Sequence, residues 1–195
     1  MKNSKLKYTV KIALLAAISV IVMFFEFPIM FIAPNFYKLD LSEAVILMGG
    51  FALGPLSAVI MEFLKNVLNI FLDGTTTGFV GEFANFVTGC CFTVPAALIY
   101  KYKKNIKGAL LGMAVGTVSI GIVGGLINYF VMLPMYSAFM PLDTIISLGA
   151  DITKFIHDKF TFVLFAVVPF NMVKGILCSV ISLLLYKKLS KILHK

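Results

Sequence analysis

The feature that most constrains this chain is a succession of strongly apolar segments, most of them close to the length of a bilayer-crossing helix. A hydrocarbon core is about 30 Å thick and takes about 20 helical residues to cross. Hydrophobic residues make up 60% of the 195 residues and charged residues only 13%, whereas a soluble domain is typically about 45–50% apolar and about 25% charged. The sequence therefore excludes a soluble globular protein, a disordered chain and a fibrous protein.

Glycine, proline and polar residues divide the apolar sequence into six segments. The pair Gly54-Pro55 separates a short second segment from the third, and residues 73–78 form a polar loop before the fourth. Residues 31–42 connect the first two segments, and residues 141–159 form the longest loop, which matches no motif. We predict a single all-α integral membrane domain over residues 1–195, with six transmembrane helices at approximately 8–30, 43–53, 56–72, 81–100, 108–133 and 160–186.

Lysines predict the orientation of these helices. All 17 basic residues are lysines, set against nine acidic residues, for a net charge of +8. Basic loops stay in the cytoplasm, and six spans place three lysine clusters and both termini on that side, whereas five spans place two clusters outside. The N-terminal lysines followed by the first apolar segment resemble a signal peptide. No small-residue cleavage site follows the segment, so we expect it to be retained as the first span. The clustered lysines are Lys2, Lys5, Lys7, Lys11, Lys101, Lys103, Lys104, Lys107, Lys187, Lys188, Lys191 and Lys195.

Polar side chains within the predicted spans mark a candidate binding site. A lysine at the centre of a membrane helix costs about 2.5–3.5 kcal/mol, and Lys174 lies near the middle of the last span, on the same face as Asn171. Glu82 and Asn85 are also three residues apart at the start of the fourth span, and Asn128 lies in the outer half of the fifth. These groups can bind a neutral or weakly charged solute that carries hydroxyl or amide groups. A structural hydrogen-bonded pair between helices is the alternative for Lys174 and Asn171.

A second polar stripe lies on the third span. Glu62, Lys65, Asn66 and Asn69 follow i,i+3 and i,i+4 spacing, which places them on one helical face. Because Glu62 and Lys65 can neutralise each other, the stripe fits a structural ion pair and a binding site equally well.

Small residues form a flat strip on the first span, at Ala13, Ala16 and Ala17. In membranes, two small residues four positions apart let another helix approach closely. The spacing does not decide between a partner protein's helix and packing within this chain.

Motifs for catalysis, metal binding and nucleic-acid binding are absent from the sequence. It has no HExxH, GxSxG or P-loop motif, and His157 and His194 lie outside the spans, far from any cysteine. Cys90, Cys91 and Cys178 fall in apolar runs without metal-ligand spacing. The lysines also lack the base-reading neighbours of a nucleic-acid interface. We therefore expect no enzyme activity, metal, cofactor or nucleic acid, and a membrane enzyme is the least favoured alternative.

Several short motifs are spread over nearly the whole chain. They are Lys38-Leu39-Asp40-Leu41-Ser42-Glu43, Gly54-Pro55, Glu62-Phe63-Leu64-Lys65-Asn66, Thr77-Gly78, Gly81-Glu82-Phe83-Ala84-Asn85-Phe86, Asn128-Tyr129 and Asn171-x-x-Lys174. With Ala13-x-x-x-Ala17, they resemble the riboflavin-binding S components of the energy-coupling factor (ECF) vitamin transporters.

The resemblance implies a six-helix fold with an occluded pocket on the outward side, covered by the connector 31–42 as a lid. Riboflavin is then the transported ligand rather than a cofactor. Glu82, Asn128, Asn171 and Lys174 would hydrogen-bond its ring edge and ribityl hydroxyls. The lid side would be lined by Leu39, Asp40 and Gly81, and Asn85 completes the expected substrate-binding set.

The resemblance also implies partners and a location. Such a chain sits in the bacterial plasma membrane as a multi-pass protein and captures riboflavin from outside. It docks through the first span, here Ala13, Ala16 and Ala17, onto a transmembrane T protein coupled to two ATP-binding cassette ATPases, which drive delivery inward. An S component for another vitamin and a stand-alone small-solute permease remain as alternatives.

Overall fold

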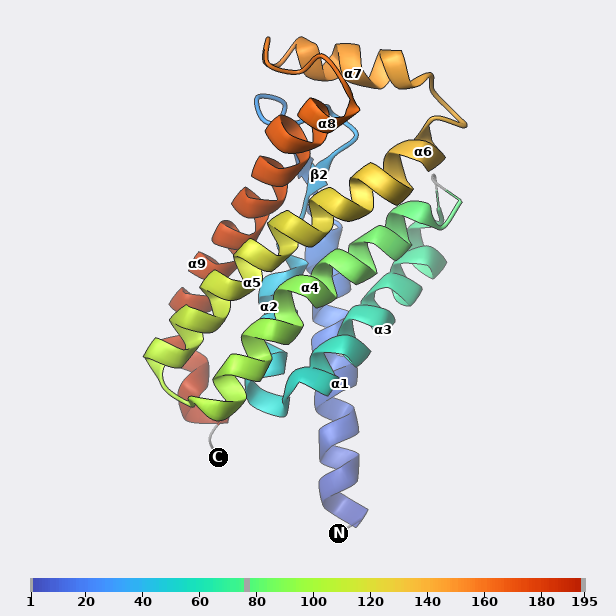
Figure 1. The fold of residues 1–195 in the computed structure, drawn as a ribbon. Coiled ribbons are helices and arrows are strands. Elements are labelled where there is room, and N and C mark those ends of the chain that lie inside the picture. The colour runs from blue at the N-terminus through green and yellow to red at the C-terminus, as the bar shows by residue number, and fades with distance from the viewer. Residues whose placement is uncertain (1, 76–77, 194–195) are drawn as a thin grey trace.

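Long apolar stretches form the helices of this protein, which is described here from a computed structural model (Figure 1). The structure describes residues 2–75 and 78–193, and the side chains of residues 5–75 and 78–186. Among the residues singled out from the sequence, Thr77, His194 and Lys195 lie outside the described residues. The same holds for the side chains of Lys2, Lys187, Lys188 and Lys191.

The helices form one bundle, capped at one end by a connector and a short crossing helix (Figure 1). Two long helical runs each contain a π-helical turn, labelled η, and two short strands pair antiparallel, with Phe27 opposite Leu39. In chain order the elements are α1 (Lys2–Met23), β1 (Phe27–Pro28), β2 (Lys38–Leu39), α2 (Ser42–Leu53), α3 (Pro55–Asp73), α4 (Val80–Tyr102), α5 (Ile106–Ile127), η1 (Asn128–Met132), α6 (Leu133–Tyr136), α7 (Leu142–Ala150), α8 (Lys159–Phe162), η2 (Val163–Val167) and α9 (Val168–Leu193).

Five helices in the described part of the chain are long and apolar enough to cross a membrane. The predicted second span is a helix, α2, but its 12 residues cover only about 18 Å, less than a hydrocarbon core of about 30 Å. The predicted count of six membrane spans is therefore not confirmed. Nine of the α2 residues are buried, so this short helix is an internal element of the bundle.

The first helix and the longest loop differ from the sequence prediction. The first helix ends at Met23 instead of residue 30, because Pro28 disfavours a helical conformation at Phe27 and the chain turns into β1. The predicted loop 141–159 contains a helix, α7, whose Ile145 and Gly149 are buried. Phe162 packs against Gly149, so this helix lies on the bundle instead of extending from it.

Glycines let α4 and α5 approach closely. A Cβ atom at Gly112 would lie 2.6 Å from the carbonyl oxygen of Ala96, and one at Gly116 would lie 2.4 Å from that of Phe92. Both distances are too short for a side chain, so these positions require glycine. These two glycines therefore serve packing between helices of the same chain.

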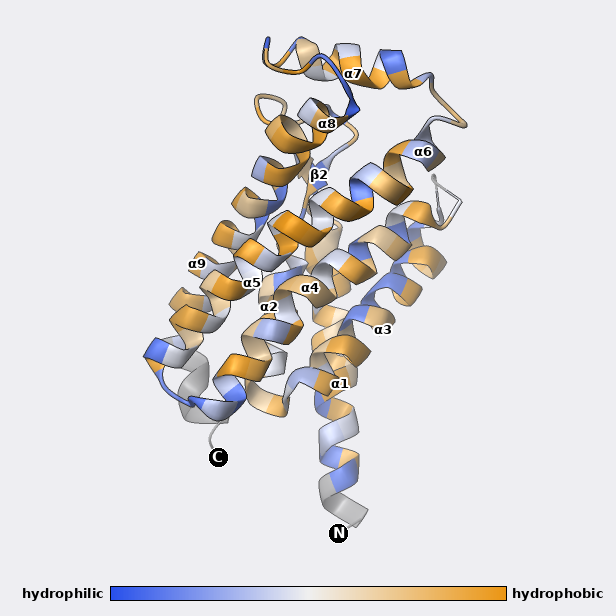
Figure 2. Ribbon diagram, viewed as in Figure 1, coloured by the Kyte–Doolittle hydropathy of each residue, from blue (hydrophilic) through white to orange (hydrophobic). Residues whose placement is uncertain are grey.

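Hydrophobic residues cover most of the length of the helices, and hydrophilic residues gather at the α4–α5 turn (Figure 2). Large apolar side chains such as Leu14, Phe71 and Ile122 are 57–82% exposed along the bundle, as a lipid-facing surface requires. The start of α1, the end of α9 and the α4–α5 turn lie at one end, and the connector and α7 lie at the other (Figure 1).

Candidate substrate-binding site

A cavity of about 550 Å³ lies under the connector, between the ends of α3, α4, η1 and α9 that lie nearest to it. Sites for small molecules typically measure about 300–1,000 Å³. Seven of the eight binding residues expected from the sequence line it, namely Asp40, Gly81, Glu82, Asn85, Asn128, Asn171 and Lys174. The structure brings them together from four separate stretches of the chain.

Leu39 is the expected residue that does not line the cavity. It is completely buried and packs in an apolar cluster with Ala33, Ile145 and Phe162. Successive side chains of an extended segment point to opposite sides, and Asp40 is the neighbour that lines the cavity. Leu39 thus attaches the connector to the apolar cluster that also packs against α7.

Lys174 is held between two carboxylates at the inner wall of the cavity. Its Nζ atom lies 2.9 Å from Oδ2 of Asp40 and 3.0 Å from Oε1 of Glu43. An ammonium group has three N–H donors, so these two contacts leave one for a ligand. The expected site lysine is therefore both paired and close to the cavity.

The pairing continues inward as a chain of five buried charges. Lys65 Nζ lies 3.1 Å from Oε1 of Glu43 and 2.9 Å from Oε2 of Glu62. Each of the five side chains, including Asp40 and Lys174, belongs to a residue that is at most 7% exposed. The structural pairing of Glu62 with Lys65, left open by the sequence, is confirmed. The chain comprises three carboxylates and two ammonium groups, which leaves one excess negative charge.

Asp40 connects this charge chain to the connector. Its Oδ1 atom accepts hydrogen bonds from the backbone N–H of Ser42, at 2.9 Å, and from the hydroxyl of Ser42. Burial alone raises the pKa of Asp40, but Lys174, Lys65 and the Ser42 hydroxyl together hold it well below its usual range. Asp40 is therefore a carboxylate at neutral pH.

The connector is bonded to the rim of the cavity. The Tyr37 hydroxyl donates to Oδ1 of Asn128 at 2.6 Å, and Lys38 Nζ lies 2.5 Å from Oε1 of Glu26. The hydrogen bond to Glu26 and its negative charge raise the pKa of Lys38, and burial raises the pKa of Tyr37. These contacts fix the connector to the rim of the cavity.

Aromatic side chains form one side of the cavity. The sequence could not predict which ones, because it contains 26 phenylalanines and tyrosines. Phe36 and Tyr37 come from the connector, Tyr136 from α6 and Phe170 from α9. The Tyr37 and Phe170 ring centroids are 5.6 Å apart in an edge-to-face arrangement, and those of Phe36 and Tyr136 are 6.0 Å apart.

Carboxamide groups supply the polar walls. The Asn128 amide donates to the Gly124 carbonyl at 2.9 Å, and the Asn171 amide donates to the Val167 carbonyl at 3.0 Å. A Cβ atom at Gly124 would lie 2.8 Å from the Asn171 amide nitrogen, so this glycine makes room for it. η1 begins at Asn128, and η2 ends at Val167. Such π-helical turns are frequent at functional sites.

Asn85 lines the cavity and carries an acceptor that no described residue satisfies. Its Oδ1 atom is buried and has no hydrogen-bond partner within the described residues, while its amide nitrogen lies 3.8 Å from the sulfur of Met23. Buried polar atoms are nearly always satisfied, so this oxygen suits a ligand donor. Nearby, Glu82 accepts a hydrogen bond from the Thr75 hydroxyl at 3.2 Å.

Two residues of the first-helix strip lie on the surface and one does not. Ala13 and Ala17 are exposed, whereas Ala16 is 1% exposed and packs in a cluster with Ile12 and Met61. Of the three strip alanines, only Ala13 and Ala17 therefore lie on the exposed side of α1.

Comparisons with known proteins bear on this site. Residues 7–186 match the family described as ECF transporter, substrate-specific component. The riboflavin transporter RibU of Staphylococcus aureus is 35% identical over 97% of this chain and 93% of its own length. The riboflavin transporter FmnP of Bacillus subtilis is 31% identical over 95% of this chain and 93% of its own. A solved structure of the S component of a bacterial ECF transporter has a TM-score of 0.76 and 32% identity, and the match covers 98% and 99% of the two chains.

Proposed function

Since the chain belongs to the family of substrate-specific components of ECF transporters, we propose that it is the S component that captures riboflavin for uptake. Relatives of nearly equal length are riboflavin transporters, so the chain is a multi-pass membrane transport subunit and not an enzyme. The observation that carries the proposal is the cavity, which places an aromatic side next to carboxamides and a paired lysine.

Riboflavin has a flat tricyclic ring, a ring edge with alternating donors and acceptors, and a chain of hydroxyl groups. The aromatic side, formed by Phe36, Tyr37, Tyr136 and Phe170, suits the flat ring. Carboxamides both donate and accept hydrogen bonds, so we assign Asn128 and Asn171 to the ring edge.

The hydroxyl chain needs acceptors and a donor. The Glu82 carboxylate and the Asn85 carbonyl oxygen supply acceptors, and the remaining N–H of Lys174 supplies a donor. Asp40 contributes by holding Lys174, at 2.9 Å, and Gly81 lines the wall beside Glu82.

Transport needs an energy source outside this chain, which has no P-loop. We propose that the chain docks onto a transmembrane T protein coupled to two ATP-binding cassette ATPases, through the exposed Ala13 and Ala17 on α1. The end that bears the lysine-rich α4–α5 turn is assigned to the cytoplasm, so that the cavity opens toward the outside.

The first experiment is an absorbance spectrum of the chain purified in detergent. Flavin bands, and release of riboflavin on denaturation, are the expected result. Titration of riboflavin fluorescence then gives the affinity.

Two substitutions test the site residues. Lys174→Ala and Asn171→Ala each remove a hydrogen-bonding group, which should weaken riboflavin binding by about 1–3 kcal/mol, or raise Kd about 5- to 150-fold. Lys101→Ala is the control, because Lys101 is exposed and far from the cavity.

Two outcomes select another function. A colourless protein that does not quench riboflavin fluorescence points to another vitamin. Uptake into liposomes by this chain alone points to a permease, whereas uptake that needs ATP and the T protein supports an S component.

Ala13→Leu tests the docking surface. It should abolish coupled uptake and leave riboflavin binding unchanged. Unchanged uptake would reject the docking surface.

A further inference from the structure

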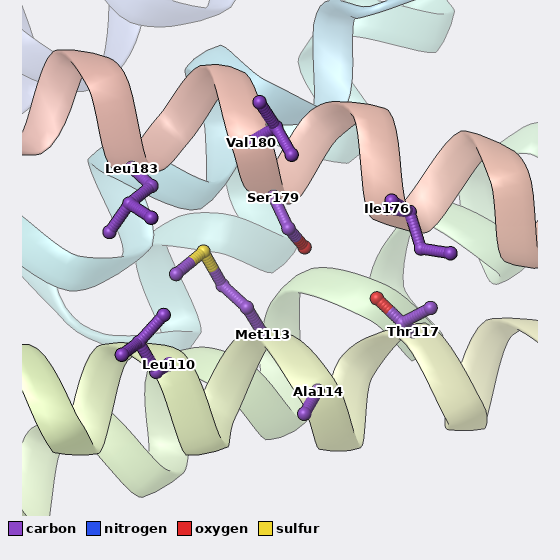
Figure 3. A pocket seen from close by; sticks show the side chains of 8 residues that line it. All are labelled: Leu110, Met113, Ala114, Thr117, Ile176, Ser179, Val180 and Leu183. Atoms are coloured by element: carbon purple, nitrogen blue, oxygen red, sulfur yellow. The ribbon is translucent and has the colours of Figure 1, made fainter.

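A second cavity, of about 390 Å³, lies between α5 and α9 and shares no residue with the riboflavin cavity. Figure 3 shows side chains from the two helices facing each other across it. Its walls are apolar, with Leu110 and Ala114 on α5 and Ile176, Val180 and Leu183 on α9. Leu110, Ile176 and Val180 are 47–51% exposed, so this groove is open to the lipid.

The groove ends at a cluster of unpaired positive charges. Lys107 is three residues before Leu110 and therefore lies on the same face of α5. Lys101 lies in the last turn of α4, and Lys103 and Lys104 lie in the adjoining α4–α5 turn. All four lysines are exposed. None of the four makes an ion pair within the described residues.

We propose that this groove binds an anionic phospholipid, with one acyl chain between α5 and α9 and the headgroup on the lysines of the α4–α5 turn. The groove alone cannot select a lipid, because lipid tails are as apolar as its leucines. The headgroup provides the selectivity, since basic sites between membrane helices bind anionic headgroups, with each lysine contributing about a five-fold preference. This site goes beyond riboflavin capture and does not depend on it.

The chain contains no tryptophan, so a single introduced tryptophan reports on its own surroundings. Leu110→Trp places it in the groove, and Leu111→Trp is the matched control. Leu111 is the next residue and is also 47% exposed, but it does not line the groove. Both variants are reconstituted in bilayers containing either brominated phosphatidylglycerol or brominated phosphatidylcholine. We expect stronger quenching of Leu110→Trp by the brominated phosphatidylglycerol, and equal quenching of Leu111→Trp by the two lipids.

Neutralising the lysines tests the headgroup contact. Lys103→Gln, Lys104→Gln and Lys107→Gln combined should remove the lipid preference at Leu110→Trp and leave riboflavin binding unchanged, which verifies the fold. Equal quenching of Leu110→Trp by both lipids before neutralisation, or a preference that survives it, would overturn the proposal.

A second measurement uses the unsubstituted groove, in case the indole ring displaces the lipid. Native mass spectrometry of the chain, extracted from bilayers with equal amounts of the two lipids, should show retained phosphatidylglycerol. The triple lysine variant should lower the retained ratio of phosphatidylglycerol to phosphatidylcholine by at least about ten-fold. An unchanged ratio, or no retained lipid on the parent chain, would overturn the proposal.

Discussion

Substituting Lys65 with methionine should destabilise the protein more than any exposed lysine substitution. Its Nζ atom lies within 3.1 Å of Glu43, Glu62 and the Ser42 hydroxyl, and the residue is completely buried. Lys65→Met leaves three buried carboxylates with one ammonium group. Removing one partner of a buried ion pair costs about 3–5 kcal/mol, and for a chain of this size each kcal/mol shifts Tm by about 2–4 °C. The expected fall in Tm is therefore about 6–20 °C.

The assay is thermal unfolding in detergent without riboflavin, with Lys101→Met as the exposed control. The double variant Glu62→Gln/Lys65→Met removes one charge of each sign and restores the original balance. It should be more stable than Lys65→Met alone, because replacing a buried pair by neutral groups costs far less than breaking it. A Tm of Lys65→Met within about 2 °C of the parent, or a double variant less stable than the single one, would refute the role of the charge chain.

Three further results follow from the same geometry. Tyr37→Phe removes the 2.6 Å hydrogen bond to Asn128. Losing about 0.5–1.5 kcal/mol should make riboflavin dissociate about 2- to 12-fold faster, as measured by stopped-flow fluorescence. An unchanged dissociation rate would argue against the connector acting as a lid. Gly89→Ala places a Cβ atom 2.6 Å from the Glu62 carboxylate. This overpacking should lower the free energy of unfolding, measured in denaturant, by about 1–3 kcal/mol. An unchanged free energy of unfolding would mean that the Glu62 side chain moves freely. Riboflavin at 100 times its Kd should stabilise the protein by about 2.7 kcal/mol, and a ligand-independent Tm would contradict binding to the folded state.

The membrane-domain class and most of the helix positions could be predicted from the sequence. Bilayer thickness sets the length of an apolar span, and breakers such as Gly54, with a φ of 98°, mark the turns. The sequence could not predict that α7 forms within the loop 141–159, because its nine residues are too few to show a clear helical pattern. Its two buried residues, Ile145 and Gly149, belong with a cluster that includes Phe162, which lies outside this loop.

Local spacing also predicted part of the site. Asn171 and Lys174 are three residues apart, so their shared face follows from helix geometry, as does the Glu62–Lys65 pair. The motifs behind the resemblance added Asp40 and Gly81 to the same cavity. The importance of Glu43 was missed, because nothing near it in the sequence is its partner.

The sequence by itself determined that the chain folds in a lipid bilayer, where its helices approximately begin and end, and which side chains share one helix face. All three depend on residues within a few helical turns of one another. Only the tertiary structure decided which faces meet. It joined Lys174 to Asp40 across 134 residues and Tyr37 to Asn128 across 91. It also buried Ala16 and Leu39 beside exposed or cavity-lining neighbours. Those choices depend on how the helices pack against one another, and a bilayer-length apolar segment carries little information about its packing partner.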